Sequence, residues 1–282
     1  MSKRATNPID IWRIEGNQKI AKKDHLAVEE PLEIKLSYGL VEAREQKSIS
    51  ITMRTPGCDF DLAIGFLFTE GIIQSQHQVS SIAFEKHWNP TMQENVVLVK
   101  LTEEVKLDLK SLERHFYTSS SCGVCGKASI EAIHTQTQYD LANQTVRFAP
   151  AVLHQLPASL RVQQAVFEDT GGLHAAALFD ANGKLHLIRE DVGRHNAVDK
   201  LIGAALQEGM LPLSNFLILV SGRASFELVQ KAMMAGIPML AAVGAPSSLA
   251  IELAKEKNMS MVGFLRDQSF NIYSHPERIV VS

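Results

Sequence analysis

The chain has 282 residues, of which 45% are hydrophobic and 21% are charged, and its net charge is −3. This length and apolar fraction exclude a disordered chain and favour two domains or one large one. The small net charge gives no electrostatic reason to expect nucleic-acid or membrane-surface binding, and no apolar stretch is long enough to span a bilayer.

Three cysteines in a chain of this size do not make a disulfide framework, which is typical of proteins from a reducing compartment. The chain does not open with the basic start and apolar run of a signal peptide. We therefore expect the protein to be cytoplasmic.

The first part of the chain predicts a small α+β unit. Short segments that alternate apolar and polar residues, or that are mostly apolar, are typical of strands; they are 9–14, 32–36, 49–53, 81–84 and 95–101. Residues 59–72 predict a helix, and Asp59 or Asp61 is expected to cap its start. We assign this small N-terminal domain to residues 1–115.

Two of the three cysteines, Cys122 and Cys125, lie in a segment rich in serine and glycine, just before residues 127–133, which predict a helix. A thiol before a helix feels the positive end of the helix dipole, which lowers its pKa, and the ammonium of Lys127 would add to this effect. Glycines permit backbone angles that leave a side chain accessible. We therefore hypothesise that Cys122 or Cys125 is a reactive sulfur that another molecule is able to reach.

Three other interpretations of this cysteine pair remain open. The pair is able to form half of a zinc site, for which Cys58, His115 and His134 are the candidate partners. It also has the spacing of a thioredoxin-like dithiol, or it is an inert structural pair. We expect Cys58 itself to be a packed small hydrophobic residue rather than a third reactive thiol.

The second part of the chain predicts alternating strands and helices, and therefore an α/β domain with its sheet between helices, over residues 116–282. Pro157 must start or kink the first helix. The expected helices are 150–167, 192–207, 224–235 and 247–257; the expected strands are 173–179 and 184–190, which form a hairpin, then 216–220, 238–243 and 259–265.

Polar residues of this second part gather where strands are expected to end. Arg194, Arg223 and Arg266 each follow a strand, and ligands of open α/β sheets bind beyond such strand ends, next to helix N-termini. Three guanidinium groups at one edge predict an anionic, phosphorylated ligand. Asp191 and Asp199 are candidates to accept hydrogen bonds from a ribose or a base.

Each of these residues also has a structural interpretation. The arginines are able to form surface salt bridges, and His195 to cap or bridge backbone groups near Asp191. His174 is equally well explained as a core histidine with satisfied hydrogen bonds.

The chain resembles the FdhD family of formate dehydrogenase accessory sulfurtransferases over about residues 9–279. The segments that carry the resemblance, in the family's order, are 54–57, 65–73, 122–126, 172–177, 190–200, 221–227, 262–264 and 273–278. It implies an α/β fold with a C-terminal cytidine-deaminase-like three-layer α/β/α domain and a smaller N-terminal α+β domain. It also implies a homodimer.

The resemblance does not extend to the zinc chemistry of the deaminases. Those enzymes need a His-x-Glu segment before their Cys-x-x-Cys segment. The nearest match, at His174, lacks the glutamate and follows the cysteines. We therefore expect no metal of the protein's own.

The resemblance implies that sulfur passes as a persulfide from a cysteine desulfurase to the molybdenum bis(molybdopterin guanine dinucleotide) cofactor, which formate dehydrogenase requires. By position, Cys122 is the implied persulfide carrier and Cys125 its helper. The implied cofactor-contacting residues are Phe264, Leu265, Arg266, Asp267, Gln268 and Ser269.

From the strand-end positions we place Asp191, Arg194, His195, Ser221 and Arg223 in the same pocket, so that replacing Arg223 with alanine is expected to weaken guanine-nucleotide binding. The alternative function is a non-catalytic chaperone that holds the cofactor and docks on the dehydrogenase. The two functions differ in whether Cys122 is essential.

Overall fold

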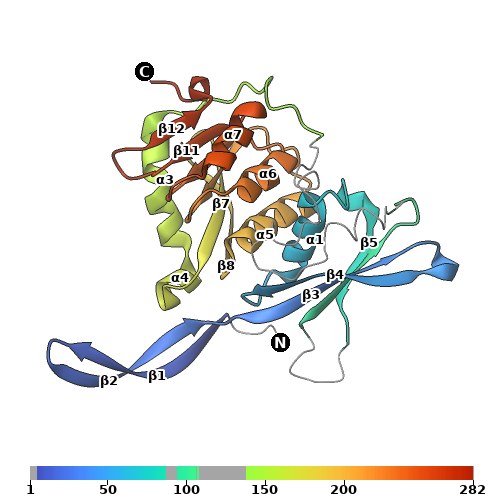
Figure 1. The fold of residues 1–282 in the computed structure, drawn as a ribbon, viewed down its shortest axis with the longest axis horizontal. Coiled ribbons are helices and arrows are strands. Elements are labelled where there is room, and N and C mark those ends of the chain that lie inside the picture. Colours follow the sequence, from blue (N-terminus) through green and yellow to red (C-terminus); the bar gives the residue numbers. More distant parts are fainter. Residues whose placement is uncertain (1–4, 87–93, 106, 108–137, 282) are drawn as a thin grey trace.

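The structure, a computed structural model, describes residues 5–86, 94–105, 107 and 138–281. It contains a four-stranded sheet from the N-terminal part, a six-stranded sheet from the C-terminal part, and a two-stranded arm that extends away from both (Figure 1). The predicted α/β class is confirmed. The expected domain boundary at residue 115 lies outside the described residues.

The N-terminal sheet has the strand order β4-β3-β6-β5. Its strands are β3 (Glu30–Tyr38), β4 (Glu45–Arg54), β5 (Val79–Phe84) and β6 (Val96–Leu101). Strands β3 and β6 are parallel and the other neighbours are antiparallel. Leu32, Ile34 and Leu36 alternate with partly exposed residues along β3, so one face of the sheet is buried, and α1 (Asp59–Thr69) packs there.

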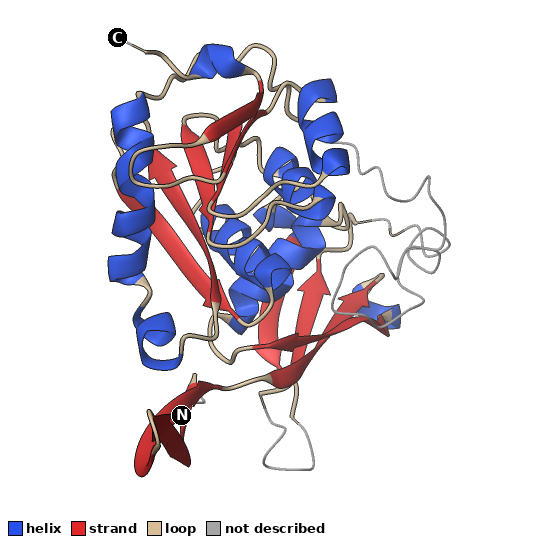
Figure 2. Cartoon of the chain, turned by 60° about the vertical axis from the view of Figure 1, so that its left-hand side comes forward, coloured by secondary structure: helices blue, strands red, loops and turns tan. Residues whose placement is uncertain are grey.

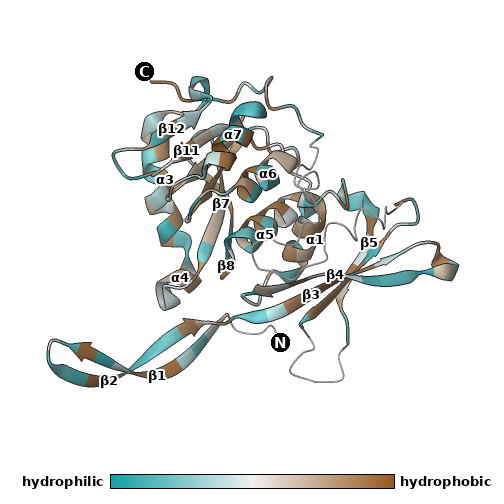
Figure 3. Ribbon diagram, in the orientation of Figure 1, coloured by the Kyte–Doolittle hydropathy of each residue, from teal (hydrophilic) through white to brown (hydrophobic). Residues whose placement is uncertain are grey.

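The arm is an antiparallel hairpin of β1 (Thr6–Glu15) and β2 (Gln18–Ala27). The prediction of a strand over 9–14 is confirmed, but β2 was not predicted because its lysines interrupt the alternation that marks a strand. Hydrophobic and hydrophilic segments alternate along the arm (Figure 3), and Trp12 and Ile14 are 64% and 65% exposed.

The C-terminal sheet has the strand order β12-β11-β10-β9-β7-β8. Strands β9, β10 and β11 are parallel, whereas β7, β8 and β12 run antiparallel to their neighbours. The strands are β7 (His174–Asp180), β8 (Leu185–Asp191), β9 (Phe216–Val220), β10 (Met239–Ala242), β11 (Ser260–Gly263) and β12 (Asn271–Ser274). The predicted hairpin and the predicted strands over 216–220, 238–243 and 259–265 are confirmed, and β12 is an addition.

Helices cover both faces of this sheet. Helix α3 (Pro150–Gln163) lies on one face, where Leu153, Leu156 and Leu160 pack against β7, β9 and β10 (Figure 2). Helices α5 (Arg194–Gln207), α6 (Phe226–Met234) and α7 (Ser248–Glu256) cover the other face. The three-layer α/β/α arrangement is therefore present. The helix expected over 150–167 starts at Pro150, contains Pro157, and is followed by a separate helix, α4 (Ala165–Thr170).

The two sheets share one hydrophobic core because α1 and α5 lie against each other. At their crossing, a β-carbon on Gly65 would lie 1.8 Å from the carbonyl oxygen of Asp199, and one on Gly203 would lie 1.9 Å from that of Asp61. Only glycine at both positions permits this approach. The buried residues of the N-terminal sheet, α1, α5 and α6 consequently form a single cluster.

An ion pair and a hydrogen bond to Asp61 reinforce this contact between the two parts of the chain, whereas the ion pair of Asp59 lies within the N-terminal part. Asp61 accepts hydrogen bonds from Arg189 Nε and Gln207 Nε2, each at 2.8 Å, and Asp59 pairs with the buried Arg54 at 2.9 Å. The prediction that Asp59 or Asp61 caps α1 is therefore wrong, since both carboxylates face tertiary partners and the N-cap residue is Cys58.

Candidate functional site

The predicted reactive loop with Cys122 and Cys125 lies outside the described residues, as do the helix expected over 127–133 and the zinc candidates His115 and His134. Cys58 is described, and it is exposed in a left-handed backbone conformation, with φ of 54°, just before α1. The expectation that Cys58 is packed is therefore wrong. Within the described residues, no three His, Cys, Asp or Glu side chains cluster so that they are able to hold a metal ion.

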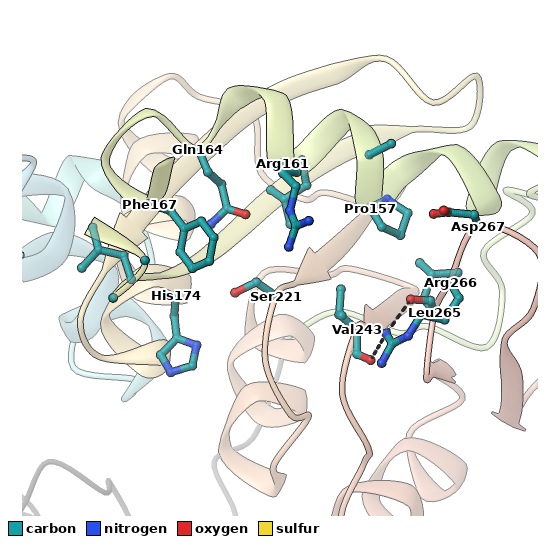
Figure 4. A pocket seen from close by; sticks show the side chains of 15 residues that line it. Pro157, Arg161, Gln164, Phe167, His174, Ser221, Val243, Leu265, Arg266 and Asp267 are labelled. Atoms are coloured by element: carbon teal, nitrogen blue, oxygen red, sulfur yellow. Dashed lines mark hydrogen bonds between the residues drawn. The ribbon is translucent and has the colours of Figure 1, made fainter. Parts of the chain in front are cut away.

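A cavity of about 760 Å³ lies at the edge of the C-terminal sheet where β9, β10 and β11 end (Figure 4). Ser221, Val243 and Leu265 come from these strand ends, and α3, α4 and the start of β7 close the other side. The cavity is lined by Pro157, Ala158, Leu160, Arg161, Gln164, Phe167, Gly171, Gly172, Leu173, His174, Ser221, Val243, Leu265, Arg266 and Asp267. The cavity lies at the strand ends, where the positions of the polar residues predicted a ligand site.

Two arginines give the cavity its positive charge. Arg266 is oriented by hydrogen bonds from its Nη1 to the carbonyl oxygens of Val243, at 2.7 Å, and Leu265, at 3.0 Å. Arg161 points from α3 toward the strand ends in Figure 4, and its guanidinium has no hydrogen-bond or ion-pair partner within the described residues. An unpaired guanidinium beside a cavity is suited to bind a carboxylate or a phosphate.

The segment implied to contact the cofactor borders this cavity. Phe264 is 44% exposed and has a φ of 53°, whereas the next residue, Leu265, is fully buried. The N–H of Phe264 donates to the carbonyl of Gly244, and that of Leu265 to Ala242, each at 3.1 Å. A positive φ is unfavourable for a non-glycine residue, so these bonds hold the aromatic side chain outward against a local strain.

The second half of this segment is a tight exposed turn. The N–H of Arg266 donates to the carbonyl of Ser269 at 2.9 Å, and His154 of α3 contacts the carbonyl of Arg266 through Nδ1 at 3.1 Å. Of the six implied residues, Leu265, Arg266 and Asp267 line the cavity, whereas Gln268 and Ser269 are exposed outside its lining.

The five residues that we placed in the pocket from strand-end positions divide into two groups. Ser221 lines the cavity, and its Oγ accepts the N–H of Ala175 at 2.9 Å. Asp191, Arg194, His195 and Arg223 are not among the lining residues. The three arginines at strand ends therefore do not all meet in this cavity, because only Arg266 reaches it.

Asp191 faces the protein interior rather than the cavity. It is fully buried, pairs with Lys200 Nζ at 2.7 Å, and accepts N–H groups from Thr55 at 3.1 Å and Gly193 at 2.8 Å. The same holds for Asp199, which is 2% exposed and pairs with Lys231 at 2.9 Å. Both carboxylates are used to join the two parts of the chain.

The two histidines near the sheet edge have different surroundings. His195 Nε2 lies 3.4 Å from Ser225 Oγ and 3.6 Å from Glu227 Oε2, so it contacts α6 and not the backbone near Asp191. His174 is partly buried and lines the cavity, which does not fit a core histidine. Burial and the positive charges of Arg194 and His195 lower the pKa of His174, so its neutral form is favoured.

Sequence reasoning missed the contribution of α3 and α4 to the cavity. Arg161 lies in a helix, and no strand-end pattern marks it. Helix α4 is anchored by Glu190, which accepts the N–H groups of Val166 at 3.3 Å and Phe167 at 3.1 Å. Burial raises the pKa of Glu190 despite these hydrogen bonds.

The fold and this cavity define an α/β protein with a positively charged strand-end site of a size suited to a nucleotide-like ligand. Residues 27–280 match the FdhD/NarQ family. A protein named sulfur carrier protein FdhD from Streptomyces coelicolor is 50% identical over 281 residues, covering 99% of this chain and 97% of the relative. A protein of the same name from Sulfurisphaera tokodaii is 40% identical over 272 residues, covering 96% and 98%.

The chain therefore belongs to the FdhD/NarQ family. Among solved structures, a protein described as a formate dehydrogenase accessory protein from Desulfotalea psychrophila superposes with a TM-score of 0.75. It is 24% identical, and the match covers 98% of this chain and 100% of that one. This similarity supports the overall fold.

Proposed function

We propose that this protein is a sulfur carrier that serves formate dehydrogenase. It receives sulfur as a persulfide on Cys122 from a cysteine desulfurase and delivers it to molybdenum bis(molybdopterin guanine dinucleotide), which is its bound substrate. The names of the relatives support the sulfur-carrying role. The observation that carries the cofactor part is the strand-end cavity with Arg161 and Arg266 in its lining.

The first step needs only thiol chemistry. The Cys122 thiolate attacks the terminal sulfur of the desulfurase persulfide, a new S–S bond forms, and the desulfurase cysteine leaves as a thiolate. Cys125 is the proposed helper, either as a relay or by resolving the persulfide as a disulfide. We further propose that the protein works in the cytoplasm as a homodimer. Within the described residues, no helix has the length and apolarity to cross a membrane.

The cavity fits the guanine dinucleotide part of this substrate. The guanidinium groups of Arg161 and Arg266 are suited to pair with phosphates, and Asp267 is an acceptor for the N–H groups of a guanine edge. The exposed ring of Phe264 offers a flat apolar surface beside the same edge. Arg161 thereby takes the place that we had expected Arg194 and Arg223 to fill.

Intact-mass analysis tests sulfur transfer directly. After incubation with a cysteine desulfurase and cysteine, the wild-type protein is expected to gain one reducible sulfur, and Cys122→Ala is expected to gain none. Cys58→Ala is the matched control, because Cys58 is exposed but has no proposed role. An unmodified wild-type protein that still binds guanine nucleotides would favour the non-catalytic chaperone.

Isothermal titration with GDP tests the cavity. Charge-assisted hydrogen bonds contribute about 1.5–3 kcal/mol, so Arg161→Gln is expected to weaken GDP binding about 10- to 100-fold. Arg13→Gln makes the same charge change on the exposed arm and is expected to bind like the wild type. Equal affinities for wild type and Arg161→Gln would remove Arg161 from the site.

A further inference from the structure

A second group of nitrogen donors lies on the opposite face of the sheet from Arg161. In β7, Ala175 and Ala177 pack in the core beneath α3, whereas Ala176 and Leu178 pack in the core beneath α5. Side chains alternate along a strand, so His174 belongs to the α5 face. Figure 4 shows its ring directed away from Arg161.

Arg194 is the first residue of α5, and its guanidinium lies on this face without a hydrogen-bond acceptor among the described residues. Its Nε is buried and has no hydrogen-bond partner, and the side chain makes no ion pair or hydrogen bond with any residue that the structure describes. A buried donor is nearly always paired in a native protein, and a charged one especially so. The missing acceptor is therefore best supplied by a bound anion.

The neighbouring carboxylates do not supply that acceptor. Asp191 is used by Lys200 and by backbone N–H groups, and Glu227 lies beside His195 and interacts with Ser225. The positive charges of Arg194 and His195 reach His174 strongly enough to lower its pKa, after the larger effect of burial. Asp191 acts in the opposite direction and raises the pKa of His174. The three basic side chains therefore lie near two carboxylates, of which Asp191 is engaged by Lys200 and Glu227 by His195.

Gly222 leaves room for the imidazole ring of His174. Gly222 follows β9, and a β-carbon there would lie 3.2 Å from Nδ1 of His174, closer than ordinary van der Waals contact. Glycine at this position lets the imidazole lie directly against the end of β9. A side chain at this position would require the ring to shift by a few tenths of an ångström.

We propose that His174, Arg194 and His195 form a binding site for a phosphate group on the α5 face of the sheet, at the border of the cavity that Arg161 and Arg266 line. Phosphate has several oxygens in a tetrahedral arrangement, so it is able to accept from a guanidinium fork and from imidazole N–H groups that approach from different elements. A carboxylate has only two oxygens in one plane. The site is inferred independently of the proposed sulfur transfer, and its phosphate comes either from free inorganic phosphate or from a nucleotide.

NMR titration of the His174 ring protons tests this site, with inorganic phosphate, GDP and guanosine as probes. His174→Asn identifies the signal among the 10 histidines. Phosphate is expected to shift the His174 signal saturably and to raise its titration midpoint, since a bound anion favours imidazolium. Arg194→Gln is expected to weaken this response at least tenfold, and Arg194→Lys to retain part of it.

One further variant and two probes separate the possible results. Arg161→Gln is expected to keep the phosphate response of His174 while losing GDP affinity in the cavity, and a loss of both would overturn the separation of the sites. A His174 response to GDP that competes with phosphate identifies the nucleotide as the source. A response to phosphate alone identifies the free ion. If neither phosphate nor GDP moves His174 in the folded wild-type protein, the proposal is wrong, whatever the mass analysis of Cys122 shows.

Discussion

The contact between α1 and α5 predicts that a single methyl group at Gly203 destabilises the whole protein. An alanine β-carbon there would lie 1.9 Å from the carbonyl oxygen of Asp61, and real contacts of this kind are almost never below 3.0 Å. The helices would therefore have to separate by roughly 1 Å, in an interior that is close-packed. Both colliding groups belong to helix backbones, so neither is able to turn aside as a flexible side chain would.

The expected loss of stability follows from two opposing effects. Overpacking of a core typically costs about 1–3 kcal/mol, and a backbone collision belongs at the upper end. Alanine is better than glycine in a helix by about 1 kcal/mol, which offsets part of that cost. We therefore expect Gly203→Ala to lower the free energy of unfolding by about 2 kcal/mol, and the melting temperature by about 4–8 °C.

Urea denaturation followed by circular dichroism is the assay. The control is Gly172→Ala, whose β-carbon would lie 3.7 Å from its nearest neighbour and cause no collision. The double variant Gly65→Ala/Gly203→Ala is expected to lose less than the sum of the single variants, because the helices need to separate only once. A Gly203→Ala protein as stable as the wild type would refute the close contact.

Two further predictions concern charged groups. Burial acts to raise the pKa of Glu227, but hydrogen bonds from His195, its own backbone and Ser225 outweigh it and lower the pKa to about 2. Its carboxylate therefore stabilises the fold above about pH 4.5, by about 1–2 kcal/mol after allowing for solvent screening. Acid titration of the wild type is expected to show this stabilisation lost as the pH falls from about 4.5 to 2. Glu227→Gln is expected to lack this pH-dependent loss. Lys231→Met removes the cation that pairs with the buried Asp199 and the partly buried Glu70. Urea denaturation is expected to show a loss of about 3–5 kcal/mol, partly restored in Lys231→Met/Asp199→Asn. Full stability of the single variant would contradict this.

The parts of the fold that the sequence predicts are those set by local pattern. The apolar run 216–220 predicts a strand buried on both faces, and β9 lies in the middle of the C-terminal sheet. Strand β2 has no such pattern, because both of its faces are largely solvent-exposed and its neighbours are β1, with which it pairs, and α4. The contact between Gly65 and Gly203 cannot be predicted locally, since each glycine alone looks like a weak point in a helix.

The residues of the candidate site also divide into those that the sequence predicts and those that it misplaces or misses. The sequence places the cavity at the correct edge because strand ends carry its polar residues, and Arg266 and Ser221 are found there. It misplaces Asp191, since Thr55 from the other part of the chain covers that carboxylate. It misses Arg161, because the position of a helical residue above a sheet edge depends on tertiary packing.

The segment 190–200 shows why sequence similarity to the family does not separate folding from binding. Asp191 and Lys200 form a buried ion pair. Both bond to the backbone of Thr55 in the other part of the chain, and Asn196 donates to the carbonyl of Met53 at 2.8 Å. Between them, Arg194 has no partner within the described residues, and its positive charge helps to lower the pKa of His174. A substitution at Asp191 or Lys200 would therefore reduce ligand binding by unfolding the interface, whereas one at Arg194 would reduce it in a protein of unchanged stability. Measuring unfolding and binding on the same variants distinguishes these two roles within one short segment.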